Sequence, residues 1–587
     1  MNSPPSNRSR FPEAATQIAS NAPALPASIT PPEASFTAAS LASPILSFAA
    51  YQRDLAERSI LFWDVLRKRA NNMLEHEDAG LPPLLSFKYE LLLDGRQLER
   101  RANYALLRIT EAGDACWDDC VDPEKPPVIV LDPRAGHGPG LGGFKRDSEV
   151  GIALHTGHPV YFVVFFPEPC PHQKIADVLD VLKIFIAHVI ERHGGRKPIL
   201  YGNCQAGWAV TLLSAAAPGL PGPAVLNGSP LSYWSGEPGI NPMRIMAGFN
   251  GGVWLAHFLS DLNRGRFDGA WLVQNFETLR PGNAVWDKYV KLFIEIDTEE
   301  ERFLDFERWW NGFYRLSTEE IVAIIGDLFV GNRLEQSNMR LDDSVVDLKR
   351  ITNPLIIFAS YGDNITPPHQ ALGWIPTVYG STEALKRAGQ RIIYLTNPHV
   401  GHLGIFVSAS VARLEHRAIL EHIDRIEALP PGLYEMKIEN PTHDPDCRKD
   451  QYRVHFEPRS VEFLHFDYPE QVFSRVRDLS EFFEEVYRGV FSPWVKAAAT
   501  PWLASWLHWM HPMRFKIYMW SEQFLPWMHA ISAMAEAIRC NRAQLPAEVT
   551  FKALERRMDE EVSAYWETAR KVRDATQERA FKELYDN

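Results

Sequence analysis

One segment, residues 198–208 (PILYGNCQAGW), constrains the fold of this chain more than any other. A short apolar run leads into a turn of small residues with Cys204 at its apex, and an alanine-rich apolar segment, residues 208–217, follows at once. This layout predicts a buried strand that turns sharply into a helix and exposes one side chain at the end of a sheet, the geometry called a nucleophile elbow. The alternative is an apolar cysteine buried by packing alone, because cysteine is among the most commonly buried residue types.

Candidate strands and helices alternate on both sides of this turn. Apolar residues at helical spacing predict an amphipathic helix over residues 175–189. Apolar runs bounded by proline, glycine or polar residues predict strands at residues 86–93, 104–109, 128–132, 159–166, 224–227, 354–360, 391–396, 433–438 and 452–456. The alternation predicts an α/β fold with a mostly parallel sheet and helices on both faces.

The chain is long for one domain, and its composition changes along its length. The expected organisation is a disordered leader (1–45), an N-terminal helical segment (46–85), the first part of the α/β core (86–231), a helical insertion (232–350), the second part of the core (351–428) and a mainly helical C-terminal extension (429–587). The aromatic-rich insertion is expected to lie over the carboxyl edge of the sheet as a lid. The alternative is a separate helical subdomain that does not contact the site.

The C-terminal extension contains six tryptophans between Trp494 and Trp527. Apolar residues there keep helical spacing, which is most often typical of a core between helices. The alternative is a surface that binds a polyester granule or a lipid surface, because indole rings suit an interface between water and an apolar phase.

Composition limits the classes of partner. The formal net charge is −13 and the pI is about 5.8, so a nucleic acid partner is not expected. The six cysteines lack the spacing of a disulfide framework or a zinc site, so no metal is expected. Because no signal peptide and no long apolar segment are found, we expect a cytoplasmic protein without a transmembrane segment. A homo-oligomer is compatible with the sequence.

Two loops downstream of Cys204 supply the partners that a cysteine nucleophile needs. Asp363 follows the strand predicted at residues 354–360, and His402 follows the strand predicted at residues 391–396. Nucleophile, acid and histidine in this chain order, each just beyond a strand, are the arrangement of an α/β-hydrolase triad. We therefore predict Cys204 as the nucleophile, His402 as the base and Asp363 as the orienting acid of an acyl transfer through a thioester.

Three other residues compete for these roles. His399 lies on the same loop as His402, but glycines flank His402 and allow the loop to bring its ring close to Cys204. His369 is expected on the surface or at the start of a helix. Asp132 precedes a proline and is expected to anchor a turn.

An acyl transfer also needs an oxyanion hole. One donor should be the backbone N–H of Gln205, the residue after the nucleophile. The second should come from Gly136 or His137, in a loop with five glycines between residues 136 and 143. The alternative is a flexible or phosphate-binding loop, although the segment matches neither the dinucleotide nor the Walker pattern.

Three basic residues near this loop could contact an anionic substrate. Arg134, Lys145 and Arg146 are candidate contacts for the phosphates of coenzyme A. They are a local basic group in an acidic chain, which is compatible with binding an anionic substrate.

These residues resemble the poly(3-hydroxyalkanoate) synthases, and more closely an uncharacterised bacterial family described as related to them. The synthases carry a lipase-like box with Cys in place of Ser, matched by residues 202–207 (GNCQAG). They also have an acid in an Asp-His-Ile-x-Pro context, matched by residues 363–367 (DNITP), and a Gly-His pair, matched by residues 401–402.

The resemblance covers residues 48–410. It implies an α/β-hydrolase fold with a helical lid insertion, and a thiolate that takes an acyl group from (R)-3-hydroxyacyl-CoA. His402 would activate the thiol and the incoming hydroxyl, Asp363 would support His402, and no cofactor would be needed.

This chain departs from the synthase pattern in four places. Ala206 replaces the second glycine of the box, Asn364 replaces the histidine after the acid, and the loop around His137 and the C-terminal extension differ. We therefore predict an acyltransferase that passes a Cys-bound acyl group from acyl-CoA to a hydroxyl acceptor. The alternatives are a thioesterase or esterase with the same triad, and a non-catalytic granule- or membrane-associated protein.

Overall fold

The computed structural model describes residues 38–112, 115–116, 121–237, 240, 242–440, 452–542, 544–545 and 550–586. The chain divides into two units, Met1–Arg53 and Asp54–Asn587. The described part of the first unit is the start of helix α1 (Ala38–Asp78), which begins inside the predicted leader 1–45. Residues 38–45 of the predicted leader lie in this helix, and residues 1–37 of it lie outside the described residues.

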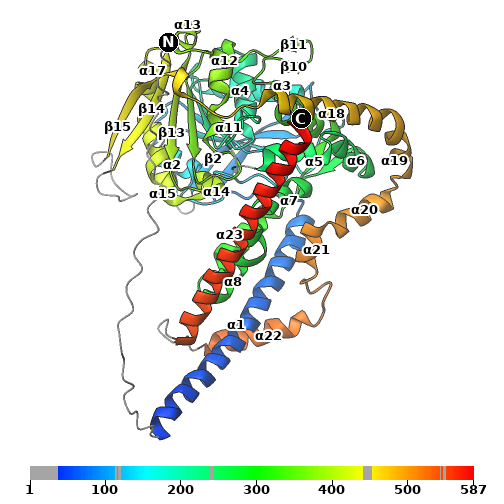
Figure 1. Cartoon of the computed structure of the whole chain (residues 1–587). Coiled ribbons are helices and arrows are strands. Elements are labelled where there is room, and N and C mark those ends of the chain that lie inside the picture. Colours follow the sequence, from blue (N-terminus) through cyan, green and yellow to red (C-terminus); the bar gives the residue numbers. More distant parts are fainter. Residues whose placement is uncertain are drawn as a thin grey trace, which may run out of the picture. The chain divides into compact units, whose positions relative to one another are not determined.

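An eleven-stranded sheet organises the second unit (Figure 1). Its order is β1-β2-β5-β4-β6-β7-β12-β13-β14-β15, with β3 paired to β2. The strands from β5 to β14 are parallel, whereas the β1–β2, β2–β5 and β14–β15 pairs are antiparallel. The strands are β1 (Lys88–Asp94), β2 (Tyr104–Ala112), β3 (Ala115–Cys116), β4 (Val128–Leu131), β5 (Val160–Phe165), β6 (Ile199–Asn203), β7 (Ala224–Asn227), β12 (Leu355–Ser360), β13 (Arg391–Asn397), β14 (Gly432–Glu439) and β15 (Arg453–Arg459). The predicted α/β class with a mostly parallel sheet is confirmed.

The sheet continues beyond residue 428, the predicted end of the α/β core. β14 pairs with β13 in parallel, and β15 closes this edge in antiparallel register. The segment described from the sequence as a mainly helical extension, 429–587, thus begins with two strands of the core. The apolar residues of segments 433–438 and 452–456 predict two strands, but they do not indicate which sheet these strands join.

Successive residues of the strands point to opposite faces, so the core has two layers. Ile129 and Leu131 of β4 belong to one hydrophobic cluster, and Val128 and Val130 belong to the other. The first face is covered by α3 (Ile175–Arg192), α4 (Ala206–Ala216), α11 (Pro368–Leu372), α12 (Trp374–Tyr379) and α13 (Thr382–Arg387). The second face is covered by α2 (Glu149–His155), α14 (His402–Val407), α15 (Ala409–Val411), α16 (Arg417–Glu421) and α17 (Ile423–Ala428).

The insertion between β7 and β12 is mainly helical and packs against the core. Its helices are α5 (Met246–Asn250), α6 (Trp254–Leu262), α7 (Ala270–Leu279), α8 (Lys288–Ile294), α9 (Glu300–Trp310) and α10 (Thr318–Ala323). Two small antiparallel sheets of two strands each, β8 (Arg266–Asp268) with β9 (Arg315–Ser317) and β10 (Arg340–Leu341) with β11 (Ser344–Val345), complete it.

The C-terminal helices tie the insertion to the rest of the second unit. They are α18 (Glu470–Val486), α19 (Ser492–Ala498), α20 (Pro501–Met510), α21 (Pro512–Tyr518), α22 (Met528–Asn541) and α23 (Thr550–Tyr585). Arg514 of α21 donates two hydrogen bonds, of 2.6 and 3.0 Å, to the buried Asp268 of β8. Arg58 of α1 pairs with Glu555 of α23 at 2.9 Å. Among the described residues, no helix is long and apolar enough to cross a bilayer.

Candidate active site

Cys204 lies at a tight turn between β6 and α4. Its φ of 49° is in the left-handed region, which L-residues with a side chain rarely adopt and which costs on the order of 1–3 kcal/mol. A Cβ on Gly202 would lie 2.8 Å from the Cα of Gly207, and a Cβ on Gly207 would collide with Ser229. The two glycines therefore allow the turn, and the N-terminus of α4 lies next to Cys204.

The structure brings Cys204, His402 and Asp363 together. Asp363 follows β12, and His402 is the first residue of α14, which follows β13. Nδ1 of His402 lies 2.7 Å from Oδ2 of Asp363. The other carboxylate oxygen of Asp363 accepts hydrogen bonds of 2.7 and 2.8 Å from the backbone N–H groups of Ile365 and Thr366, which fix its orientation.

The electrostatics of this group favour a charged imidazole. Burial lowers the pKa of His402, but the Asp363 carboxylate and the hydrogen-bonded Cys204 raise it to about 10. Cys204 and His402 are each only 5% exposed. The imidazole of His402 therefore lies between Asp363, which holds the ring in place, and Cys204.

The competing residues lie elsewhere. His399 is exposed, and its backbone N–H donates to the side chain of Asn397. His369 was expected on the surface or at the start of a helix. It lies in the first turn of α11, where it is buried. Asp132 accepts hydrogen bonds of 2.6 and 2.7 Å from the backbone of Gly140 and Leu141, so it does anchor a turn.

The glycine-rich loop lies between the triad and the insertion. The N–H of Tyr314 donates to the carbonyl of Gly136, and the N–H of Gly138 donates to the carbonyl of Gly312. This antiparallel pattern turns the N–H of His137 away from the insertion. Within the described part of the chain, the N–H groups of Gly136, His137 and Gln205 donate to no other group, so all three predicted oxyanion donors are free.

The side chain of His137 links the same loop to the insertion. Its ring lies 4.4 Å from that of Trp309 and 5.9 Å from that of Trp310. Burial lowers the pKa of His137 to about 4, and the positive charge on His402 acts in the same direction. His137 is therefore a neutral ring near the triad, and the insertion contacts the site through it.

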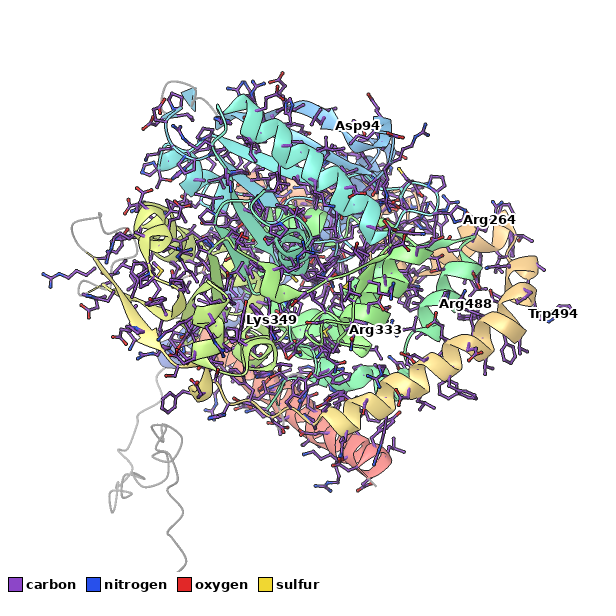
Figure 2. All side chains as sticks on the ribbon, turned by 90° about the horizontal axis from the view of Figure 1, so that it is seen from above. Asp94, Arg264, Arg333, Lys349, Arg488 and Trp494 are labelled. Atoms are coloured by element: carbon purple, nitrogen blue, oxygen red, sulfur yellow. The ribbon has the colours of Figure 1, made fainter. Side chains whose placement is uncertain are left out.

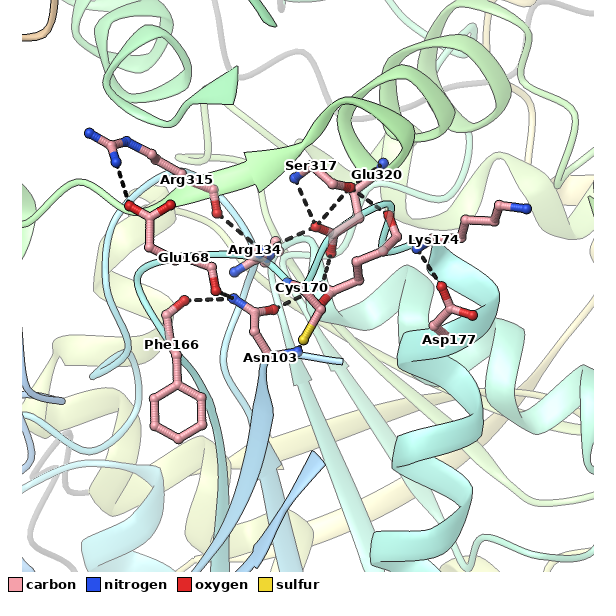
Figure 3. Close-up of polar contacts among 11 residues, drawn as sticks. Asn103, Arg134, Phe166, Glu168, Cys170, Lys174, Asp177, Arg315, Ser317 and Glu320 are labelled. Atoms are coloured by element: carbon pink, nitrogen blue, oxygen red, sulfur yellow. Dashed lines mark hydrogen bonds and ion pairs between the residues drawn. The ribbon is translucent and has the colours of Figure 1, made fainter. Parts of the chain in front are cut away.

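The three basic residues near the loop have different surroundings. Arg134 is buried, and its guanidinium donates to Glu320 and to the carbonyl of Arg315, both at 3.1 Å (Figure 3). Arg134 thus joins the insertion to the core, and its predicted contact with a phosphate stays a prediction. Lys145 is partly buried beside the Phe144 ring, and Arg146 is exposed.

A buried polar network that the sequence did not reveal lies behind the elbow. Glu149 of α2 accepts hydrogen bonds from Asn203 at 2.5 Å and from Asn227 at 2.9 Å. The carbonyl of Asn227 accepts the N–H of Cys204 at 2.8 Å. Burial raises the pKa of Glu149 to about 8, although the two amides lower it. Glu149 thus connects the residue before the nucleophile to the end of the next strand.

The described residues also line a cavity of about 1690 Å³ outside the triad. It lies between the loop after β5, the insertion and α18–α19, and its lining carries both acidic and basic side chains. Cys204, Asp363 and His402 do not line it. No group of three or more His, Cys, Asp or Glu side chains among the described residues is arranged to hold a metal ion.

The chain is similar to several known proteins. The chain is 41% identical over 556 residues, 92% of its length and 75% of the relative's, to "Uncharacterized protein in ackA 5'region" of Rhizobium meliloti. It is 24% identical over 278 residues to poly(3-hydroxyalkanoate) polymerase subunit PhaC of Haloferax mediterranei, which covers 45% of this chain and about half, 51%, of that protein. A monoacylglycerol lipase structure from Paleococcus ferrophilus aligns over 51% of this chain and 96% of its own, at 16% identity and a TM-score of 0.30.

The predicted relationship to an uncharacterised family near the poly(3-hydroxyalkanoate) synthases is therefore confirmed. The matching family model spans residues 54–587, nearly the whole chain. This protein belongs to the family described as "Protein of unknown function (DUF3141)".

Proposed function

We propose that this protein is an acyltransferase of the poly(3-hydroxyalkanoate) synthase type, which takes an acyl group from a 3-hydroxyacyl-CoA and passes it to a hydroxyl acceptor. The observation that carries the proposal is the hydrogen-bonded group of Cys204, His402 and Asp363 at a strained strand-to-helix turn. The 24% identity to a PhaC subunit supports the choice of substrate class. No cofactor takes part, because acyl-CoA is the substrate.

The reaction has two halves that use the same residues. In the first, the Cys204 thiolate attacks the thioester carbonyl, the carbon–sulfur bond to coenzyme A breaks, and His402 gives its proton to the departing thiolate. In the second, His402 takes the proton of an acceptor hydroxyl, whose oxygen attacks the acyl-enzyme and releases the Cys204 thiolate. The free N–H groups of Gln205 and His137, with Gly136 as an alternative donor, stabilise the oxyanion in both halves.

Transfer and hydrolysis differ only in whether water reaches the acyl-enzyme. Cys204 belongs to an apolar cluster that includes Trp309 and Phe313 of the insertion and Phe406 of α14. Such surroundings exclude water, which favours transfer to a bound hydroxyl over a thioesterase or esterase reaction. The complete triad opposes the third alternative, a non-catalytic protein.

The test is incubation of the purified full chain with 3-hydroxybutyryl-CoA, with Cys204→Ala as the matched control. We expect release of free coenzyme A thiol together with an insoluble polyester or an ester of an added alcohol, and neither product with the control. Release of free 3-hydroxybutyrate in equal amount to the thiol would instead establish the hydrolase. No thiol release above the control would contradict both enzymatic functions.

A further inference from the structure

Helix α10 contributes residues to the walls of two cavities, and these differ in how their polar groups are paired. The larger cavity, of about 1690 Å³, is lined in part by Arg264, Arg333 and Arg488, which are labelled in Figure 2. Arg333 donates a hydrogen bond of 2.6 Å to Asp327. Arg488 lies 3.7 Å from a carboxylate oxygen of Glu484. Since its wall carries both signs of charge, this cavity does not favour one class of ligand.

The smaller cavity lies beside the nucleophile elbow. It has a volume of about 20 Å³ and is enclosed by the end of β4, by α3, by the start of α4 and by α10. Every residue that lines it is buried, and among these are Gln205 and Ala206, the two residues that follow Cys204. One water molecule needs roughly 10–15 Å³ of such space, so this cavity has room for a water molecule and not for an organic ligand.

Four side chains that line this cavity carry polar atoms without a hydrogen-bond partner in the described part of the protein. These atoms are Oδ1 of Asp132, Oε1 of Gln205, Nε1 of Trp208, and both Nε and Nη1 of Arg134. None of the four residues is more than 5% exposed. Buried polar atoms are rarely left unpaired, because burial removes their hydrogen bonds to solvent. Five such atoms in residues around one cavity indicate that a bound ligand completes their hydrogen bonds.

The chemistry of these atoms selects the ligand. The nitrogens of Trp208 and Arg134 can only donate, and Oε1 of Gln205 can only accept. Asp132 can take either role, because burial raises the pKa of its carboxyl group well above the ordinary range. A halide ion would accept hydrogen bonds but could donate none to Gln205, and the guanidinium of Arg134 would repel a metal cation.

We infer that one water molecule is bound in this cavity, where it accepts hydrogen bonds from Trp208 and Arg134 and donates one to Gln205. Water both donates and accepts two hydrogen bonds, so it matches a wall that offers donors and acceptors together. The remaining guanidinium nitrogen of Arg134, Nη2, donates to Glu320 of α10 (Figure 3). The water therefore links the residue after Cys204, through Arg134, to the insertion.

This link has a consequence for catalysis that rests on the proposed function. The backbone N–H of Gln205 is one of the oxyanion donors in the proposed reaction. A water molecule bonded to Oε1 of Gln205 fixes this side chain, and it thereby helps to hold the N–H in one orientation. The water site itself does not depend on the reaction, so it can be tested on a protein that carries out no catalysis.

A crystal structure of the full chain that resolves ordered water tests the site directly. We expect one water within about 2.7–3.2 Å of Oε1 of Gln205 and of a nitrogen of Trp208 or Arg134. In solution, cross-relaxation between water and the indole N–H of Trp208 should have opposite signs in the laboratory and rotating frames, as for a long-lived internal water. Selective labelling with ¹⁵N-tryptophan makes this measurable, and Trp208→Phe assigns the signal.

Two results on the unchanged chain would overturn the inference. One is a direct hydrogen bond from Arg134 or Trp208 to Oε1 of Gln205, with no water between them and no cross-relaxation at Trp208. The other is an anomalous signal in the cavity of crystals grown with sodium bromide, which would assign the site to a halide. Because neither measurement needs a variant, the test does not depend on the folding of one.

Gln205→Met tests the role of the bound water, since methionine has a similar length and no hydrogen-bonding amide. The matched control is Gln370→Met, at a glutamine of α11 that is 1% exposed and does not line this cavity. Gln205→Met should weaken the cross-relaxation at Trp208 at least about tenfold and lower kcat by up to about 10²-fold with little change in KM, because a misplaced group slows the reaction by such factors. Gln370→Met should keep the cross-relaxation and kcat.

The failures of the two proposals can be told apart. Full cross-relaxation in Gln205→Met would remove Gln205 from the water site, and an unchanged kcat would remove the positioning role. If the unchanged chain releases no thiol from 3-hydroxybutyryl-CoA but shows the water at Trp208, the proposed function fails and the water site stands.

Discussion

Two buried carboxyl groups flank the nucleophile elbow, and they differ in what they face. Asp363 contacts the imidazole of His402, whereas Glu149 contacts the side-chain amides of Asn203 and Asn227. Both are 2% exposed. The first carboxyl group belongs to a charged pair that raises the pKa of His402 to about 10, and the second has its own pKa raised to about 8 by burial.

The two carboxyl groups thus differ in their hydrogen-bond partners and not in their burial. A buried carboxylate that meets an imidazolium keeps its charge, because the ion pair offsets the cost of desolvation. Glu149 meets two side-chain amides and lies 3.5 Å from Nε2 of the buried His416, and burial raises its pKa to about 8. We therefore expect Asp363 to take part in catalysis through His402, and Glu149 to stabilise the backbone around Cys204.

The largest effect should come from Cys204 itself. Cys204→Ala should abolish the acyl adduct that intact-mass analysis detects after mixing with an acyl-CoA, because no nucleophile remains. Cys204→Ser should fold but react slowly, since a hydroxyl ionises far less readily than a thiol, whose ordinary pKa is about 8.5. An adduct that persists in Cys204→Ala would show that another residue is acylated.

Replacement of His402 should have the next largest effect. His402→Ala should slow acylation by on the order of 10²–10⁴-fold, the range usual for a general acid–base group. His399→Ala is the matched control, because His399 lies on the same loop but is exposed. Stopped-flow measurement of thiol release compares the two variants, and a larger loss for His399→Ala would reject the assignment of the base.

The sequence could predict those site residues that are marked by their immediate neighbours in the chain. Cys204, Asp363 and His402 could be predicted because each follows directly on an apolar run that reads as a strand. Parallel strands bring their carboxyl ends to one edge of a sheet, so three local signals placed three distant residues together.

The interactions that the sequence analysis did not predict join residues that are far apart in the sequence. Glu149 bonds to residues 54 and 78 positions away, and no local pattern marks it as buried. Arg134 was named as a candidate phosphate contact because it lies near the glycine-rich loop, and its pairing with Glu320, 186 positions away in the insertion, could not be predicted. Only the packing of the insertion against the core brings that pair together.

The charged pair can be tested separately from the rate through Asp363→Asn. Without the carboxylate, burial should lower the pKa of His402 from about 10 toward or below its ordinary value of 6.5. NMR titration of the imidazole ring measures this change, and the rate of acylation should fall less than in His402→Ala. An unchanged pKa would show that Cys204 alone keeps the ring charged.

The smallest effect on the rate, and a clear effect on stability, should come from Glu149→Gln. Because the pKa of Glu149 rises from its ordinary 4.5 to about 8 on folding, the folded state keeps a proton that the unfolded state loses. This contribution to stability is complete below pH 4.5 and is lost as the pH rises to about 8, with a slope of up to about 1.4 kcal/mol per pH unit.

Glutamine resembles the neutral acid, so Glu149→Gln should remove this pH dependence of stability and change acylation little at neutral pH. The free energy of unfolding in urea between about pH 5 and 9 measures this, with the exposed Glu191→Gln as control. Glu149→Ala removes the acceptor of the Asn203 amide and one of the two acceptors of the Asn227 amide, and it should lower stability at every pH, by roughly 1–3 kcal/mol. If Glu149→Gln kept the full slope, another buried group would be the source, and the two sides of the elbow would not differ as the structure indicates.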